Sequence, residues 1–263
     1  MIFFNGKFYQ EKNLKLSPLV DSYMFGYGVF ETLRTYQGRI FCLKEHLKRL
    51  LNSARVINLT HAYQLDELSR ITSESFQKSG LSESRIKIVL TETELLIIPH
   101  KLVLKPDIWY QKGIKTASLP LLRIFPEAKT LNNLTFVFSH KYALSQNIPE
   151  VILVDRSGIA REGSYTNLFW IENQSLCTTK TRILKGITRD LVLKEASKIM
   201  TVLEKDQKIT EIVKADEVFL TSTIGEIIPV VQIDQKVIGQ GKVGEWTLKL
   251  LKMFKNKVKE LVN

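Results

Sequence analysis

The chain has 263 residues, of which 44% are hydrophobic and 25% charged, and this composition argues against a disordered or fibrous protein. Its formal net charge is +11, but the lysines are spread along the chain and concentrate near its end, in "LKLLKMFKNKVKELV", and no nucleic-acid motif with interleaved stacking aromatics appears. We therefore expect a solvated basic surface and no nucleic-acid partner. No apolar stretch reaches the roughly 18 residues that a membrane-spanning helix needs, so we expect no membrane partner.

The N-terminal part of the chain contains both strand and helix signals. "MIFFNG" predicts a short strand, and "YGVFETLRTYQGRIF" predicts two strands joined by a turn at Gln37-Gly38. Apolar residues at helical spacing predict one helix from Leu43 and a second over about Leu65 to Ser79, which ends at Gly80. "SRIKIVLTE" and "ELLIIPHKLVLKP" predict two more strands of the same unit.

Pro106 and Gly113 mark a linker, so we place a domain boundary near residue 110. The chain is long enough for two domains, here residues 1–110 and 111–263. The second half is richer in strands than in helices. Strands are predicted in "IKTASLPLLRI", "EVILVDRSG" and "EVFLTSTIGEIIPVVQIDQKVIG", a hairpin in "YTNLFWIENQSLCTT", and helices in "LNNLTFVFSHKYALSQ" and "TRDLVLKEASKIM".

The N-terminus "MIFFNGKFYQEKNLKL" has neither the apolar region nor the cleavage site of a signal peptide. Two cysteines, Cys42 and Cys177, lie far apart in stretches that we expect in the core, so a disulfide framework is not expected. Both features favour a cytoplasmic protein.

Two stretches have the composition of an anion-binding site. In "KGITRDLVLKEA", Gly186 ends one segment and Thr188 is placed to cap a helix whose free N–H groups would face a phosphate. In "FLTSTIGEIIP", the hydroxyl residues Thr221, Ser222 and Thr223 follow an apolar strand. Plain helix capping and a plain turn are the competing interpretations, since both patterns are common.

Two charged residues have similar alternatives. Arg49 lies on the same flank of its helix as His46 and Ser53, where it is either a snorkelling surface residue or a guanidinium fork for a phosphate. Glu162, before "SYTNLF", is either a charged turn residue or the partner of a protonated ring nitrogen.

Lys129, in "EAKTLNNLTF", is either a surface charge or a reactive amine. A lysine becomes a nucleophile only if burial or a nearby positive charge lowers its pKa. The apolar run Leu131, Leu134, Phe138 and Tyr142 predicts that this segment is helical and faces a core, so Lys129 at its head is placed to point into a cleft.

Taken together, the chain resembles the class IV, fold-type IV pyridoxal-phosphate enzymes, which comprise branched-chain aminotransferases, D-amino-acid aminotransferases and aminodeoxychorismate lyases. Six stretches between about residues 20 and 250 carry the resemblance, in family order: "FGYGVFETLR", "HLKRLLNSA", "AKTLNNL", "VDRSGIAREGSYTNLFWI", "ILKGITRDLVL" and "FLTSTIGEIIPVVQIDQKVIGQGKVGEWTLKL".

The resemblance implies a role for each candidate residue. Lys129 would form the Schiff base with pyridoxal 5'-phosphate and shuttle protons, and Glu162 would pair with the pyridine nitrogen. Leu184 would pack on the ring. The phosphate would be held by Arg49, Ile187, Thr188, Ser222 and Thr223. These assignments agree with the chemistry, because a dianion needs a cation and a helix N-terminus, and the cofactor needs a charged ring.

The resemblance also implies an α/β (α+β) fold with a small two-layer N-terminal α/β domain. A larger C-terminal pseudo-barrel domain would carry Lys129, and the cofactor would lie between the two domains. Members of the family usually form dimers in which a partner loop completes the substrate site, so a homodimer acting on a small anionic substrate is expected.

Subfamily motifs favour the lyase. Leu134 stands where branched-chain aminotransferases typically have a tyrosine, and their "Y-x-R-P" motif is absent. Phe30 stands where D-amino-acid aminotransferases typically have a tyrosine, and no arginine stands two residues before His100. The short length, "KTLNNL" and "GVFETLRTYQG" resemble aminodeoxychorismate lyases instead. The resemblance thus implies a lyase that makes 4-aminobenzoate and pyruvate for folate synthesis, with Phe30 and Arg123 contacting the substrate.

Two alternatives stay open. One is an amino-acid transaminase, for branched-chain or D-amino acids, with 2-oxoglutarate or pyruvate as acceptor. The other is a non-catalytic homologue that binds the cofactor, which the intact set of Lys129, Glu162 and phosphate residues disfavours.

Overall fold

The computed structural model describes residues 1–262, which divide into two compact units. Unit 1 comprises Met1–Val103, Glu127–Asn133 and the chain end from Leu261, and unit 2 comprises Leu104–Pro126 and Leu134–Glu260. The segment around Lys129 thus packs with unit 1, although it lies within the predicted domain of residues 111–263. The predicted domain boundary near residue 110 stays a prediction.

Unit 1 is built on a six-stranded antiparallel sheet with the order β2-β1-β6-β5-β3-β4. Burial alternates along β3 and β5, because only one face of each strand lies against the core. The strands predicted from the N-terminal stretches are confirmed: β1 (Ile2–Phe4), β3 (Val29–Tyr36), β4 (Arg39–Ile40), β5 (Ser84–Leu90) and β6 (Leu95–Lys101). Strand β2 (Lys7–Tyr9) was not predicted.

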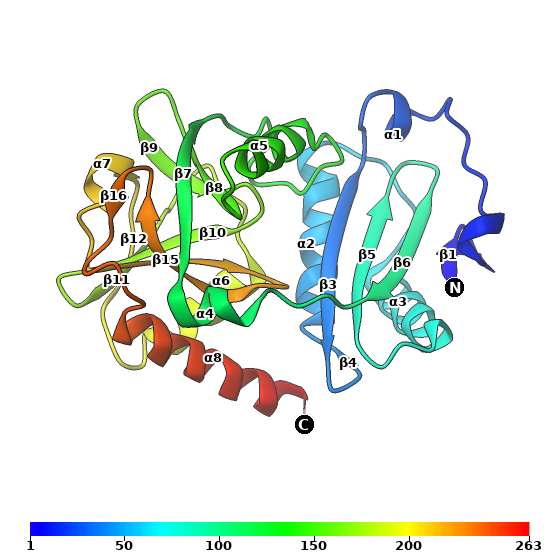
Figure 1. Ribbon diagram of the computed structural model, residues 1–263. Helices are drawn as coiled ribbons and strands as arrows, with labels where there is room; N and C mark the ends of the chain where they lie inside the picture. Colours follow the sequence, from blue (N-terminus) through cyan, green and yellow to red (C-terminus); the bar gives the residue numbers. More distant parts are fainter. Residues whose placement is uncertain (263) are drawn as a thin grey trace. The chain divides into compact units, whose positions relative to one another are not determined.

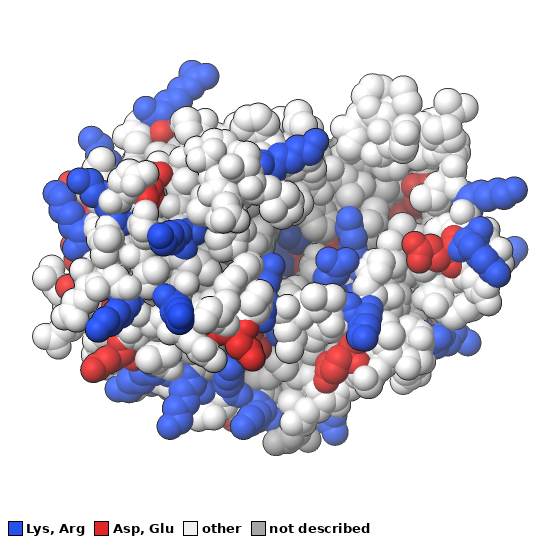
Figure 2. All heavy atoms as spheres, in the orientation of Figure 1, with Lys and Arg blue, Asp and Glu red and all other residues white. Residues whose placement is uncertain are grey.

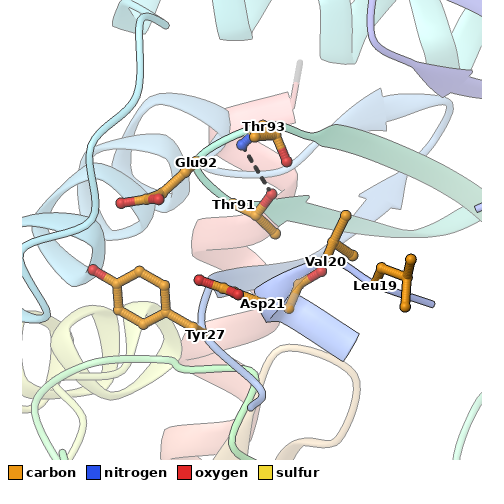
Figure 3. A pocket seen from close by; sticks show the side chains of 8 residues that line it. Leu19, Val20, Asp21, Tyr27, Thr91, Glu92 and Thr93 are labelled. Carbon is orange, nitrogen blue, oxygen red and sulfur yellow. Dashed lines mark hydrogen bonds between the residues drawn. The ribbon is translucent and has the colours of Figure 1, made fainter. Parts of the chain in front are cut away.

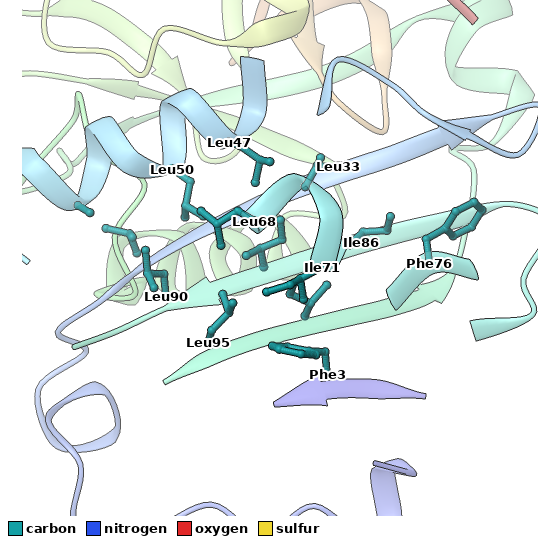
Figure 4. Packing of buried hydrophobic residues seen from close by; sticks show 14 of the residues in the cluster. Phe3, Leu33, Leu47, Leu50, Leu68, Ile71, Phe76, Ile86, Leu90 and Leu95 are labelled. Atoms are coloured by element: carbon teal, nitrogen blue, oxygen red, sulfur yellow. The ribbon is translucent and has the colours of Figure 1, made fainter. Parts of the chain in front are cut away.

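Two amphipathic helices cover one face of this sheet. Helix α2 (Leu43–Val56) packs against β3 and α3 (Leu65–Ser79) against β6 (Figure 1). Their apolar faces meet the inward residues of the sheet, as Figure 4 shows for Leu47, Leu68 and Ile86. Helix α3 ends at Gly80 with φ of +69°, a conformation that glycine adopts at no steric cost. Both predicted helices are confirmed. Unit 1 also contains the short helices η1 (Glu11–Asn13) and α1 (Asp21–Met24).

Unit 2 is built on a curled, mixed ten-stranded sheet with the order β12-β11-β10-β14-β15-β7-β8-β9-β13 and with β16 paired to β15 (Figure 1). The pairs β7–β8, β7–β15 and β11–β12 are parallel. Its strands are β7 (Ile114–Pro120), β8 (Glu150–Val154), β9 (Ile159–Gly163), β10 (Asn167–Glu172), β11 (Ser175–Thr178), β12 (Val202–Glu204), β13 (Gln207–Lys208), β14 (Glu217–Ser222), β15 (Glu226–Ile233) and β16 (Lys236–Val237). Trp170 lies fully buried in its core.

The helices of unit 2 lie around this sheet: α4 (Asp107–Lys112), α5 (Leu134–Ser145), α6 (Ile187–Ala196), α7 (Ile209–Ile212) and α8 (Glu245–Val262). Helix α4 occupies the predicted linker between Pro106 and Gly113. Basic side chains are scattered over the face seen in Figure 2, and several lie along its lower edge, where Figure 1 shows α8. Across residues 1–262, no helix is both long and apolar enough to span a bilayer.

One predicted element differs from the structure. Lys129 lies in an extended segment and not at the head of a helix, because Thr130 bridges to Val29 and the N–H of Leu131 donates to the carbonyl of Gly28 at 2.9 Å. Helix α5 begins only at Leu134, which is 75% exposed, and Phe138 is 55% exposed. The prediction that this apolar run faces a core was wrong, since α5 buries only Ser139 and Ala143.

Candidate active site

Lys129 is held by its backbone, and its amine faces an aromatic ring. Its N–H donates to Ser53 Oγ at 3.1 Å, and its carbonyl accepts from the N–H of Phe30 at 2.8 Å. The amine Nζ lies 4.4 Å from the centre of the Phe30 ring. Lys87 Nζ lies 5.3 Å from the centre of the same ring, and burial, together with the charge of Arg85, lowers the pKa of Lys87. Two lysine side chains therefore face Phe30.

Glu31, the residue after Phe30 in β3, is a buried carboxylate that binds two side chains of α2. Glu31 is fully buried and accepts from Arg49 Nε at 2.6 Å, from Arg49 Nη2 at 2.9 Å and from His46 Nδ1 at 2.8 Å. Burial alone would raise the pKa of Glu31, but the charge of Arg49 and the hydrogen bond from His46 outweigh it and hold that pKa well below its ordinary value. Burial lowers the pKa of His46 and thus favours its neutral form.

Sequence reasoning identified Arg49 but missed Glu31. The available signal was a glutamate at an inward position of an apolar strand, between Val29 and Leu33 on the same face. A carboxylate buried at such a position needs a cationic partner, and Arg49 from α2 supplies it. Arg49 is therefore fixed in direction, and its predicted contact with a phosphate stays a prediction.

In unit 2, Glu162 lies within β9 and is only 4% exposed, so it is not a turn residue. Its Oε1 accepts from Arg123 Nη1 at 3.0 Å, and its Oε2 accepts from the N–H of Leu184 at 3.0 Å. Asn167, which sequence reasoning missed within "SYTNLF", donates to the carbonyl of Leu184 at 2.8 Å and to Glu162 Oε2 at 3.5 Å. Arg123 thus contacts Glu162, and its predicted contact with a substrate stays a prediction.

Helix α6 begins beside this group. Gly186 is its N-cap residue, so Ile187 and Thr188 belong to the first turn, and Thr188 does not cap the helix as predicted. The first N–H groups of the helix have no partner within it, and the helix dipole favours an anion at this end. A Cβ on Gly186 would come within 2.1 Å of Asn167 Oδ1, so only glycine fits here.

The turn after β14 adds hydroxyl groups. Ser222 ends the strand, and its Oγ accepts from the N–H of Gly225 at 3.0 Å. Thr221 Oγ1 is buried without a hydrogen-bond partner in the described chain. Helix α6 packs against β14, the strand that contains Thr221 and ends at Ser222.

Each unit, taken by itself, carries groups that suit part of pyridoxal 5'-phosphate. In unit 2, N–H groups and hydroxyls suit a phosphate, and the anchored Glu162 carboxylate suits a protonated ring nitrogen. In unit 1, Lys129 supplies an amine for the aldehyde, and Arg49 supplies a fixed cation.

A pocket of about 280 Å³ in unit 1 has a different character. Figure 3 shows the carboxylates of Asp21 and Glu92 and the hydroxyl of Tyr27 among its lining groups, with Thr93 N–H donating to Thr91 Oγ1. Its lining contains no lysine or arginine. These carboxylates disfavour a phosphate or an acidic substrate.

Residues 28–233 match the family model described as "Amino-transferase class IV". The chain belongs to the class IV aminotransferase family. A putative branched-chain-amino-acid aminotransferase of Methanocaldococcus jannaschii is 34% identical, covering 97% of this chain and 95% of the relative. The D-alanine aminotransferase of Staphylococcus haemolyticus is 32% identical, covering 96% of each.

Solved structures agree with this family. The Escherichia coli branched-chain amino acid aminotransferase superposes with a TM-score of 0.90 at 25% identity, over 97% of this chain and 93% of that one. A T.th. branched-chain amino acid aminotransferase with pyridoxamine 5'-phosphate gives 0.91 at 26% identity, over 98% and 94%. The predicted fold-type IV architecture, enzyme class and pyridoxal-phosphate cofactor are therefore confirmed.

The predicted aminodeoxychorismate lyase is wrong. The matched relatives and structures named here are branched-chain or D-alanine aminotransferases. The lyase assignment depended on Leu134, whose side chain is 75% exposed at the start of α5 and therefore carries little information about a substrate. The stretches "KTLNNL" and "GVFETLRTYQG" contain Lys129, Phe30 and the buried Glu31. Phe30 anchors the backbone of Lys129 and Glu31 pairs with Arg49, and neither contact by itself selects a reaction.

The Glu31–His46–Arg49 group predicts a specific pH dependence of stability. Because the pKa of His46 is below 6.5 in the folded protein, the unfolded chain takes up that proton first, and the free energy of unfolding falls as the pH drops below 6.5. Glu31 adds a further loss below pH 4.5, since its folded-state pKa is lowered from that value. His46→Gln should reduce the slope between these pH values by at most about 1.4 kcal/mol per pH unit, measured by urea unfolding.

His140→Gln, at an exposed position of α5, is the matched control and should leave that slope unchanged. Equal slopes for His46→Gln and the wild type between pH 6.5 and 4.5 would contradict the assignment of a buried, neutral His46.

Proposed function

We propose that this aminotransferase is of the branched-chain type and moves an amino group from an aliphatic amino acid to 2-oxoglutarate or pyruvate. The observation that carries the proposal is the ring of Phe30 beside Lys129 Nζ, because an apolar wall at the reactive amine suits an aliphatic side chain. The similarity to a putative branched-chain aminotransferase over 97% of the chain supports it.

Bound pyridoxal phosphate supplies an electron-withdrawing ring that makes the α-proton of the amino acid acidic. In this proposal Lys129 Nζ accepts that proton and returns it to the other reacting carbon, a task for an amine held in a fixed place. Its backbone bonds to Ser53 and Phe30 restrict where Nζ can move. Glu162 holds the proton on the ring nitrogen, and its bonds to Leu184 and Arg123 fix its direction.

The remaining predicted residues orient the cofactor in this proposal. Leu184 packs on the ring, and its backbone bond to Glu162 places it there. The residues that would hold the phosphate, through a cation and through backbone and hydroxyl donors, are Arg49, Ile187, Thr188, Ser222 and Thr223.

A D-amino-acid aminotransferase is the second candidate. D-Alanine aminotransferases of several staphylococci are 30–32% identical over 96% of this chain. These values are only slightly below the 34% identity of the putative branched-chain aminotransferase. We expect Phe30 to influence which of the two substrate types is accepted, because its ring faces Lys129 Nζ directly.

We also propose a homodimer that uses the outward face of α5. Leu134, Val137, Phe138 and Leu144 project from this helix with 42% to 75% of their surface exposed. Ile124 and Phe125 extend the apolar surface, and the hydroxyl of Thr135 ties the helix to the same segment through the carbonyl of Leu122 at 3.3 Å. Several exposed apolar side chains on one helix, here with Lys141 among them, are typical of a protein interface. The cytoplasmic location stays a prediction.

Lys129→Ala should remove the yellow absorbance band that the purified protein acquires with pyridoxal phosphate. Transamination should fall by about 10³-fold or more, since the variant lacks the base that moves the proton. Lys101→Ala, at an exposed position of β6, is the control and should keep both properties. A colourless wild type that takes up no added pyridoxal phosphate would refute the proposed use of Lys129.

The substrate class is separated by a paired assay. The wild type should transfer the amino group of L-leucine, L-isoleucine or L-valine to 2-oxoglutarate or pyruvate, and should react poorly with D-alanine, because Phe30 presents an apolar surface at the amine. Product formation is measured for each donor and acceptor. Turnover of D-alanine alone would support the D-amino-acid type, and turnover of neither donor would overturn the proposal.

Phe138→Asp should disrupt the proposed dimer, because it places a charge within the apolar face of α5. Light scattering after gel filtration should give about twice 30.3 kDa for the wild type and 30.3 kDa for the variant. Leu248→Asp, at an exposed site on α8, should remain dimeric. A wild type of 30.3 kDa at micromolar concentration would speak against this dimer.

A further inference from the structure

Glu150, the first residue of β8, is a buried carboxylate outside the predicted site. It is only 2% exposed, and in residues 1–262 no lysine or arginine lies within ion-pair distance of it. The charge of Glu150 does act at longer range on Lys105, where it raises the pKa against the effect of burial. A charged group buried in this way costs several kcal/mol unless hydrogen bonds satisfy it. Burial raises the pKa of Glu150, whereas hydrogen bonds from Ser164 and from backbone N–H groups lower it.

The hydrogen bonds to Glu150 come mainly from one turn. Oε1 accepts from Ser164 Oγ at 2.5 Å and from the Ser164 N–H at 3.1 Å, and Oε2 accepts from Thr166 Oγ1 at 3.2 Å and from the Tyr165 N–H at 3.5 Å. The N–H of Val151, next along β8, donates to Oε1 at 2.9 Å. Glu150 therefore clamps residues 164–166, which connect β9 to β10.

The turn is built around this carboxylate. The N–H of Gly163 donates to the carbonyl of Thr166 at 2.8 Å and closes the turn. A Cβ on Gly163 would lie 2.0 Å from Thr166 Oγ1 and 3.1 Å from Glu150 Oε2. The glycine and the carboxylate therefore depend on each other, because a side chain at Gly163 would displace the groups that make the clamp.

The two ends of the clamped turn carry Glu162 and Asn167. Both side chains converge on Leu184, whose N–H donates to Glu162 Oε2 at 3.0 Å and whose carbonyl accepts from Asn167 Nδ2 at 2.8 Å. Asn167 also faces Gly186, the N-cap residue of α6. A change in the turn would therefore move Glu162 relative to Leu184 and α6.

We infer that Glu150 is a positioning residue that fixes, through the turn at residues 163–166, the direction in which Glu162 presents its carboxylate to the ring nitrogen of the cofactor. The inference rests on the proposed role of Glu162. The hydrogen bonds of Glu150 go to Val151 and to residues 164–166, so in this inference its effect passes through Ser164 and Thr166.

The test compares Glu150→Ala and Glu150→Gln in the full-length protein. Pyridoxal phosphate is titrated into the apoenzyme, and its dissociation constant and the pH at which its absorbance band changes are measured. Glu150→Ala should weaken binding about tenfold and move that pH by about half a unit or more. Glu150→Gln should stay within about threefold of the wild type, because its amide oxygen serves Ser164 and the Thr166 hydroxyl can turn to accept from its NH₂.

Asp155→Ala is the matched control. Asp155 is also a buried carboxylate, but it follows β8 at the end away from Glu150, and it pairs at 2.6 Å with Arg161 in the middle of β9 and not with the turn at residues 163–166. This variant should lower the melting temperature while it leaves cofactor affinity and the pH profile unchanged. If Glu150→Ala does not fold, Thr166→Val removes one bond of the clamp at constant shape and should weaken cofactor binding about threefold.

Glu162→Ala separates the proposed role of Glu162 from the inference about Glu150. If Glu162→Ala weakens cofactor binding and Glu150→Ala only lowers the melting temperature, the inference about Glu150 is overturned and the role of Glu162 stands. If neither variant changes binding to a wild type that does bind, the role of Glu162 is overturned together with the inference. Rescue by Glu150→Gln in both readouts supports the positioning role.

Discussion

The carboxylate of Glu162 receives hydrogen bonds from three segments of unit 2 that are far apart in the sequence. Arg123 follows β7, Asn167 begins β10, and Leu184 precedes α6. A nearly buried carboxylate must be satisfied by such donors, because the cost of leaving it unpaired exceeds the gain from one hydrogen bond. The Glu162 side chain therefore holds β9, the start of β10 and the segment before α6 together. The proposed cofactor contacts depend on these hydrogen bonds.

Unit 1 also contains a buried carboxylate that is satisfied by donors from another element, and here it attaches a helix to a strand. Glu31 is buried beneath α2 and draws Arg49 and His46 to it, so the helix is tied to β3 by charge as well as by apolar packing. The backbone of Lys129 is tied to the same strand through Phe30 and to the same helix through Ser53. The amine, the guanidinium and the carboxylate are thus positioned by one strand and one helix, and a rigid scaffold is what a proton-transferring lysine requires.

Family membership and reaction type depend on different residues in this chain. The roles proposed for the residues near Lys129 and for the donors at α6 are common to any reaction that starts from a bound pyridoxal phosphate, so their motifs identify the family and not the substrate. Leu134 was read as a subfamily marker, but it lies on the exposed face of α5, where an apolar residue reflects a surface requirement. The comparisons over nearly the full chain corrected the reaction to transamination.

By itself, the sequence determined the helices α2 and α3, most strands of both units, and the family. Helical spacing, strand alternation and short motifs are local, so they can be read along the chain. Only the tertiary structure decided that Lys129 lies in an extended segment, that Glu162 is buried in β9, and that Glu31, Asn167 and Glu150 belong to the networks around them. The reason is physical: whether a charged side chain is buried depends on donors from distant segments, and local periodicity carries no information about those partners.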